Sequence, residues 1–214
     1  MLRAFVILLL TCCASLGIAE NTSVIKFPAP DGRFALRVAD FTDAHGRLYV
    51  ADKVDLIETS SGKAMVDLGN LWINRESPSD REEPVLVWSA DSKWVAYGTR
   101  TIDSGKTTVY FFDGSAFKEL ALPPNLPEPK IKPRKGDSDV KLKGYAEEPL
   151  KWINPGELQI SSMLRGLGRD VGFQYRGTIV ITIVFDARHH ASARKVTGTK
   201  TEVSESWSPR AFDR

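Results

Sequence analysis

The stretch that decides the fold is Trp88-Ser-Ala-Asp-Ser-Lys-Trp-Val-Ala-Tyr97, where an aromatic residue, a polar turn and an apolar strand follow one another. The same order occurs in Phe27-Pro-Ala-Pro-Asp-Gly-Arg-Phe-Ala-Leu36 and, more loosely, in Trp152-Ile-Asn-Pro-Gly-Glu-Leu-Gln-Ile160. From Phe27 to Trp88 is 61 residues, and from Trp88 to Trp152 is 64. A motif that recurs at a steady interval indicates one supersecondary unit repeated along the chain. The sequence therefore predicts three structural repeats.

Each motif combines turn residues with a strand pattern. Asp can bond to its own backbone and Gly tolerates positive φ, so Asp31-Gly32 and Asp91-Ser92 favour tight turns. Apolar residues then alternate, as they do in strands whose two faces pack differently. Strand–turn–strand stretches follow, with turns expected at Ser61-Gly62, Asp113-Gly114 and 186–190. The leading aromatic residue should fill the space between neighbouring sheets. The residues that define the repeats are Phe27, Asp31, Gly32, Trp88, Asp91, Trp94, Trp152 and Gly156.

The Trp88–Tyr97 stretch resembles the signature of WD40-like or TolB-type β-propeller repeats. Pro30 to Leu36 also matches it well, whereas Trp152 to Ile160 matches in outline and Trp207-Ser208-Pro209 matches only the opening. The resemblance implies four-stranded antiparallel blades that serve as protein-interaction modules or as appendages to enzymes. Propellers close with about 4–8 blades of about 40–45 residues, but here three longer repeats and a stub are present.

We therefore expect an all-β fold of antiparallel four-stranded, blade-like sheets, in an incomplete or small propeller-like arrangement. A β-sandwich built from the same hairpins is the alternative. The repeats should span about 24–75, 84–122 and 148–200, within one domain over 20–214.

The N-terminus predicts export. A positive charge at Arg3, a short apolar run and small residues at Gly17 and Ala19 form a signal-peptide pattern over residues 1–19. Both cysteines lie in this segment, so the domain that follows has no disulfide. We expect a secreted or periplasmic protein with no membrane span after cleavage.

Residues 122–147 interrupt the repeats with a Pro- and Lys-rich loop. Proline fixes φ and lacks an N–H donor, which excludes an internal strand where the prolines cluster. The composition favours a solvated linker. The functional alternative is a partner-docking arm that faces an acidic surface with Lys130, Lys132, Arg134 and Lys135.

The sequence assigns no catalytic, cofactor-binding or metal-ligating residue. His189-His190 occupy a predicted turn without further ligands in sight, although a zinc site needs three or four. Ser104-Gly-Lys-Thr107 lacks the upstream glycine of a phosphate loop and is interpreted as a hairpin turn. The formal net charge of +2 does not suggest a nucleic-acid partner.

The leading hypothesis is an exported, non-enzymatic β-repeat protein that binds another protein or a cell-envelope component. One alternative is a secreted hydrolase or carbohydrate-active enzyme whose acids meet only in three dimensions. Another is a part of a larger propeller that is completed by self-association.

Overall fold

The computed structural model describes residues 23–39, 49–74, 83–100, 104–170 and 173–204. Every regular element in these ranges is a β-strand, which confirms the all-β expectation. The strands are β1 (Ser23–Lys26), β2 (Phe34–Ala39), β3 (Tyr49–Glu58), β4 (Ala64–Asn74), β5 (Glu83–Trp88), β6 (Trp94–Arg100), β7 (Ser104–Phe112), β8 (Phe117–Leu120), β9 (Val140–Asn154), β10 (Glu157–Gly168), β11 (Gln174–Phe185) and β12 (Ala191–Ser204). No helix long and apolar enough to cross a bilayer occurs among these residues. The expected signal peptide and the Trp207 stub lie outside them.

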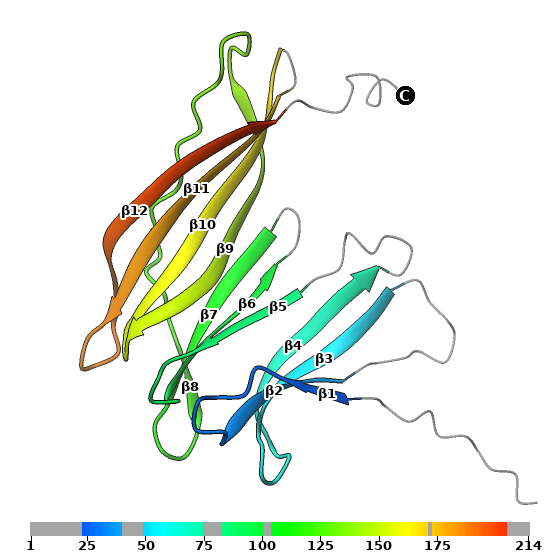
Figure 1. Ribbon diagram of the computed structural model, residues 1–214, viewed down its shortest axis with the longest axis vertical. Helices are drawn as coiled ribbons and strands as arrows, with labels where there is room; N and C mark the ends of the chain where they lie inside the picture. The colour runs from blue at the N-terminus through cyan, green and yellow to red at the C-terminus, as the bar shows by residue number, and fades with distance from the viewer. Residues whose placement is uncertain (1–22, 40–48, 75–82, 101–103, 171–172, 205–214) are drawn as a thin grey trace, which may run out of the picture.

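Consecutive strands pair antiparallel in three groups of four, as Figure 1 shows. Strands β1 to β4 form one sheet, and β5 to β8 and β9 to β12 form two meanders. These two meanders are joined into one eight-stranded sheet by a short parallel ladder, in which Ser104 pairs with Tyr145 and Gly105 with Ala146. Within the described ranges the strands do not close into a ring.

The parallel joint between β7 and β9 is a feature that the repeats do not predict. Strand β8 has only four residues and pairs with β7 from Val109 to Phe112. The earlier half of the same β7 edge is therefore open, and β9 pairs there. The segment Ser104–Thr107 belongs to this strand, so its interpretation as a hairpin turn is wrong.

The turn residues lie where the sequence places them. Gly32, Gly62, Gly114 and Gly156 all have positive φ and connect the expected strands. The Asp31 carboxylate accepts a hydrogen bond from the Arg33 N–H at 2.9 Å. The Asp91 carboxylate accepts the corresponding bond from the Lys93 N–H at 3.2 Å. Both aspartates therefore stabilise their own turns.

The middle meander is packed on both faces. From β6, Val95 and Tyr97 join a core with Phe34, Leu36 and other residues of the first sheet. Trp94 and Ala96 of the same strand face a second core, which contains residues of β10 and β11. The second core includes Leu158, Ile160, Ile179, Ile181, Ile183 and Phe185. This arrangement explains why both alternating sets of β6 side chains are apolar.

The leading aromatic residues differ in their surroundings. Trp88 packs against Phe34 and Phe117 in the first core. Trp152 belongs to the second core, where the centre of its ring lies 5.6 Å from that of Trp94. Phe27 is 38% exposed, contrary to the expectation that it fills space between sheets. No earlier sheet precedes the first repeat in the described part of the chain, so this ring has no such space to fill.

Residues 121–139, here called the strap, are ordered against the β9–β12 meander. Most of their side chains are exposed, as in a linker, but Pro129 and Asp137 are buried, and the last part of the predicted loop belongs to β9. A Cβ atom on Gly177 would lie 2.9 Å from Ile131 Cγ1 and 3.1 Å from Pro129 Cβ. The strap thus lies directly on the backbone of β11, and Figure 1 shows it running along this meander.

A polar contact fixes the far end of the strap. The Tyr175 hydroxyl, on a side chain that is 2% exposed, donates to Asp137 Oδ2 at 2.8 Å and accepts from the Arg134 N–H at 2.9 Å. The Asp137 carboxylate also accepts from the Asp170 N–H at 3.0 Å. A Cβ atom on Gly168 would overlap the Asp137 carboxylate. The strap is therefore held by apolar contacts and by these hydrogen bonds.

Candidate functional site

The β9–β12 meander has two different faces. Leu158, Ile160, Ser162 and Leu164 alternate along β10 on the face that is covered by the second core and the strap. Arg165 and Leu167 fall on the opposite face, because successive side chains of a strand point to opposite sides. Gln174 and Arg176 lie on that same face of β11. The polar face of this meander is thus turned away from both the core and the strap.

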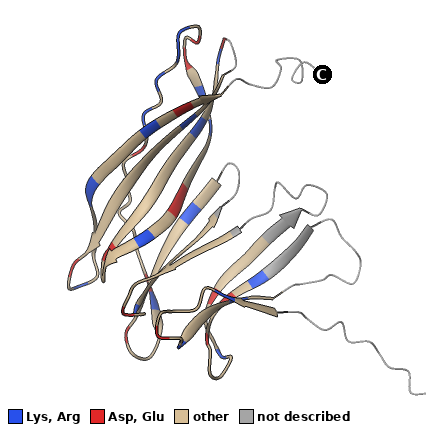
Figure 2. Cartoon of the chain, in the orientation of Figure 1, with Lys and Arg blue, Asp and Glu red and all other residues tan. Residues whose placement is uncertain are grey.

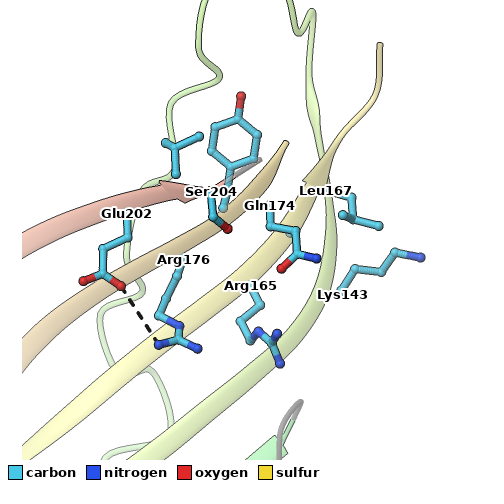
Figure 3. Close-up of a pocket in the computed structure, with 10 residues that line it drawn as sticks. Lys143, Arg165, Leu167, Gln174, Arg176, Glu202 and Ser204 are labelled. Carbon is cyan, nitrogen blue, oxygen red and sulfur yellow. Dashed lines mark ion pairs between the residues drawn. The ribbon is translucent and has the colours of Figure 1, made fainter. Parts of the chain in front are cut away.

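A pocket of about 450 Å³ occupies one end of this polar face. Figure 3 shows the labelled side chains projecting to one side of the sheet. The residues that line it come from all four strands of the meander: Lys143, Arg165, Gly166, Leu167, Gln174, Tyr175, Arg176, Glu202, Val203 and Ser204. Its charged groups are three cations and one carboxylate.

Two of these cations face each other across the ladder. Arg165 of β10 and Arg176 of β11 are direct partners in the antiparallel register. Like charges placed directly opposite on one face of a sheet repel and destabilise it. The adjacent pairs on the same face, Leu167 with Gln174 and Met163 with Thr178, carry no charge. The arginine pair therefore stands between two uncharged pairs of the β10–β11 ladder.

The third cation comes from an irregularity in β9. Arg165 pairs with Gly144 and Gly166 pairs with Leu142, so Lys143 is the extra residue of a β-bulge. Bulges bend a strand and can re-aim a side chain. At Gly166 an added Cβ atom would lie 2.4 Å from Val140 Cγ1, so glycine permits the close approach of the two strands here. The Lys143 side chain lines the pocket, as Figure 3 shows.

The carboxylate of the pocket is held mainly by a different cation. Glu202 Oε1 lies 2.5 Å from Lys200 Nζ, whereas Glu202 Oε2 lies 4.0 Å from the nearest Arg176 nitrogen. The hydrogen bond from Lys200 holds the pKa of the Glu202 carboxyl below its usual range. Glu202 is therefore ionised at neutral pH and only weakly offsets the charge of Arg176.

These groups suit binding rather than bond cleavage. Guanidinium and ammonium groups donate strong hydrogen bonds to oxyanions. Gln174 and Ser204 add neutral donors at the same end of the sheet. The lining contains no histidine, and its single carboxylate is engaged by Lys200. The arrangement can hold an anion at the surface of a rigid sheet.

The strap presents a second group of cations on the covered side of the same meander. Lys130, Lys132 and Lys135 are exposed, while neighbouring Pro129 is buried. The Arg134 guanidinium lies 5.6 Å from the centre of the Phe173 ring. The four basic residues that the sequence suggests for partner docking are thus displayed by a packed segment, and they lie on the opposite side of the sheet from the pocket.

The remaining polar clusters have structural roles. The Tyr145 hydroxyl donates to Glu147 Oε1 at 2.7 Å, and Ser162 Oγ lies 3.3 Å from it. Burial, with Glu147 and Glu128 nearby, raises the pKa of Tyr145 to about 12. Ser162 is 0% exposed and is therefore inaccessible to a substrate.

The residues that define the first two repeats meet at one rim of the molecule. The Asp31 N–H donates to Ser92 Oγ at 3.0 Å, and a hollow of about 280 Å³ between the two turns is lined by Asp31, Arg33, Asp91 and Lys93, among others. The two carboxylates already accept backbone hydrogen bonds within their own turns. We assign these residues to the scaffold.

The two adjacent histidines have different surroundings. His189 packs against Phe111, with 4.2 Å between ring centres, and His190 lies at the surface with its Nδ1 3.5 Å from Asp186 Oδ2. Within the described ranges no group of three or more His, Cys, Asp or Glu side chains is placed to hold a metal ion.

Charge is unevenly distributed along the chain. Residues 122–204 contain 14 Lys and Arg against nine Asp and Glu, whereas the rest of the chain contains 15 against 18. Figure 2 shows Lys and Arg along the strap and across β9–β12. The net charge of the whole chain does not show this uneven distribution, but counts of charged residues in separate segments do. Arg165, Arg176 and Lys143 were not singled out from the sequence because only the strand register brings them together.

Comparison with known proteins gives no family. No protein-family model matches the chain, and no curated protein matches it.

Proposed function

We propose that this chain is an exported, non-enzymatic β-repeat protein that binds an acidic component of the cell envelope through its third repeat together with the strap that precedes it. The observation that carries the proposal is the excess of Lys and Arg over residues 122–204, on a chain that is otherwise slightly acidic. A surface of one sign concentrates partners of the opposite sign and speeds their association.

The scaffold supports this role because its basic groups are held in place. The strap backbone is tied to Tyr175 and lies on Gly177, so Lys130 and Lys132 extend from an ordered segment. Ordering a flexible segment on binding costs conformational entropy, and a preorganised surface avoids much of that cost. The backbone that carries these lysines therefore does not need to become ordered when a partner binds.

No specific observation favours the hydrolase alternative. The buried carboxylates that the structure describes take part in structural contacts: Asp137 with Tyr175, and Asp55 with Arg37 at 2.7 Å. Catalytic acids need access to substrate, and these two are covered. A binding function therefore fits the polar groups that the structure describes, and none of them has to be given a catalytic role.

The test is sedimentation of the chain from Glu20 to Arg214 with vesicles of phosphatidylglycerol or of phosphatidylcholine. We expect binding to the anionic vesicles alone, and its loss between about 0.1 M and about 1 M salt, since the Debye length falls from about 10 Å to about 3 Å. The variant Lys130→Gln/Lys132→Gln/Lys135→Gln should bind less. The matched control Lys26→Gln/Lys63→Gln/Lys93→Gln removes equal charge outside the third repeat and should bind normally.

Two outcomes would contradict the proposal. Equal losses in the two triple variants would show that net charge, and not the basic region over residues 122–204, governs binding. Preference for poly-glutamate over phosphatidylglycerol vesicles would indicate an acidic protein as the partner instead of an envelope lipid.

A further inference from the structure

We infer that the pocket between Arg165 and Arg176 is a subsite for one phosphate group of the acidic partner. The inference rests on the proposed function, since it names the chemical group that the third repeat recognises. It concerns a different face of the sheet from the strap lysines, so the two can be tested apart.

Arg165 and Arg176 lie directly opposite each other on neighbouring strands. Directly opposed residues on an antiparallel pair have Cβ atoms about 5 Å apart, so the Arg165 and Arg176 side chains share one small region of the surface. Their mutual repulsion decreases when an anion lies between them. In the neighbouring ladder Arg176 is also directly opposite Glu202, whose Oε2 lies 4.0 Å from the guanidinium.

The hydrogen-bond donors of the pocket come from several strands. Lys143 reaches the pocket from β9, Arg165 from β10, and Arg176 and Gln174 from β11. Donors from three strands thus line one pocket. A carboxylate offers two oxygens in one plane, whereas a phosphate offers a tetrahedral set of oxygens that several donors can contact at once. The donor set therefore favours phosphate over carboxylate.

Glu202 brings a negative charge to the pocket. This carboxylate lines the pocket from β12, and its closer contact is with Lys200. Its negative charge repels an incoming phosphate, while its distant contact with Arg176 leaves that guanidinium available to a stronger partner. Removal of the Glu202 charge should therefore strengthen binding, which is the opposite of the effect expected for the cations.

The volume of the pocket leaves room for more than one phosphate group. Ligand pockets usually have volumes of about 300–1,000 Å³, and this one has about 450 Å³. Leu167 provides an apolar patch beside the cations. A phosphate that carries a small organic group, such as glycerol, fits both features.

The test is a titration of the isotopically labelled chain from Glu20 to Arg214 with glycerol phosphate, monitored by the backbone amide resonances. We expect shifts at residues 143, 165–167 and 174–176. Arg176→Gln should weaken binding about tenfold or more, as the loss of hydrogen bonds to a charged group predicts. Glu202→Gln should lower the dissociation constant. Arg188→Gln, in the exposed β11–β12 turn, is the matched control and should bind normally.

Further titrations identify the source of the phosphate. Sodium phosphate should bind at the same resonances more weakly than glycerol phosphate, and acetate should bind more weakly still. Binding of phosphatidylglycerol vesicles that also weakens in Arg176→Gln identifies a lipid headgroup. Vesicle binding that is unaffected by this substitution, with glycerol phosphate binding lost, identifies a soluble phosphate ester.

The failure of this inference can be told apart from that of the proposed function. If Arg176→Gln and Glu202→Gln bind all phosphate probes as the parent chain does, while the strap variant loses vesicle binding, the pocket assignment is wrong and the proposed function stands. If neither set of variants alters binding to any anion, both are wrong. Circular dichroism and thermal melts must show that each variant retains the β-sheet fold.

Discussion

The indole Nε1 of Trp88 donates a hydrogen bond to the carbonyl oxygen of Phe27, 2.8 Å away and 61 residues earlier in the chain. Trp152 repeats the relationship, since its Nε1 donates to the carbonyl oxygen of Val87 at 3.1 Å. In each case the aromatic residue that leads one repeat bonds to the backbone at the corresponding part of the preceding repeat. The tryptophans thus connect neighbouring meanders through both packing and a polar contact.

The tryptophan contacts predict a stability change. Trp88→Phe and Trp152→Phe keep an aromatic ring but remove the donor, and each should lower the free energy of unfolding by about 1 kcal/mol. Urea denaturation measures the change. Phe27→Leu keeps the acceptor carbonyl and alters only an exposed side chain, so it should change stability little. Equal stability of both Trp→Phe variants and the parent chain would show that the indole donors contribute nothing.

A second prediction concerns the contact between the strap and β11. Gly177→Val places methyl groups where Ile131 and Pro129 lie, and such overpacking costs about 1–3 kcal/mol. We expect lower stability and faster amide exchange at Arg134, whose N–H is held by Tyr175. Thr178→Val, on the other face of the strand, serves as the control. Unchanged exchange at Arg134 in Gly177→Val would mean that the strap is held independently of this contact.

A third prediction concerns the joint between the second and third meanders. An added Cβ atom on Gly105 would lie 2.8 Å from the Thr99 carbonyl oxygen and 3.2 Å from that of Glu147. Gly105→Ala should therefore force β7 and β9 apart and increase amide exchange near Tyr145 and Ala146. Ser104→Ala, at an exposed neighbour, is the matched control. Retained protection at Ala146 would show that the ladder tolerates the methyl group.

The buried tyrosines predict a loss of stability in alkali. Burial raises the pKa of Tyr110 and of Tyr145 to about 12, above the ordinary value of about 10. The unfolded chain releases these protons first, so stability is fully present below pH about 10 and is lost as pH rises toward about 12. Urea unfolding across this range measures the slope. Tyr145→Phe should show a shallower decline, and an identical decline would assign the effect to other groups.

The local parts of the fold could be predicted from the sequence, because turns and alternation depend on neighbouring residues. The hairpin turns at Gly62, Gly114 and 186–190 lie where the turn residues indicated. Trp94 and Val95 occupy opposite cores, as alternation between two packed faces implies. The resemblance to propeller repeats stays a prediction, since the described strands form no closed ring.

The remaining features depend on contacts between distant segments. Strand β9 can pair with β7 because β8 is short and leaves part of the β7 edge open. Amino-acid composition does not specify the length of β8. The strap has the proline and lysine content of a linker. It nevertheless packs on the sheet, because Gly177 leaves room for Ile131, a residue 46 positions earlier in the chain. The pocket arises from a register that places Arg165 opposite Arg176. The sequence contained two signals of the basic surface, the cluster from Lys130 to Lys135 and the charge of the segment 122–204.

The order of strand pairing has a consequence for how the chain reaches its folded state. Apart from the short β7–β9 ladder, every strand pairs with its neighbour in sequence. Such near-neighbour contacts form with little loss of chain entropy and favour rapid folding. Since a chain is synthesised from its N-terminus, each meander becomes complete from segments that are made together. The first two meanders can then assemble before β9–β12 has been synthesised.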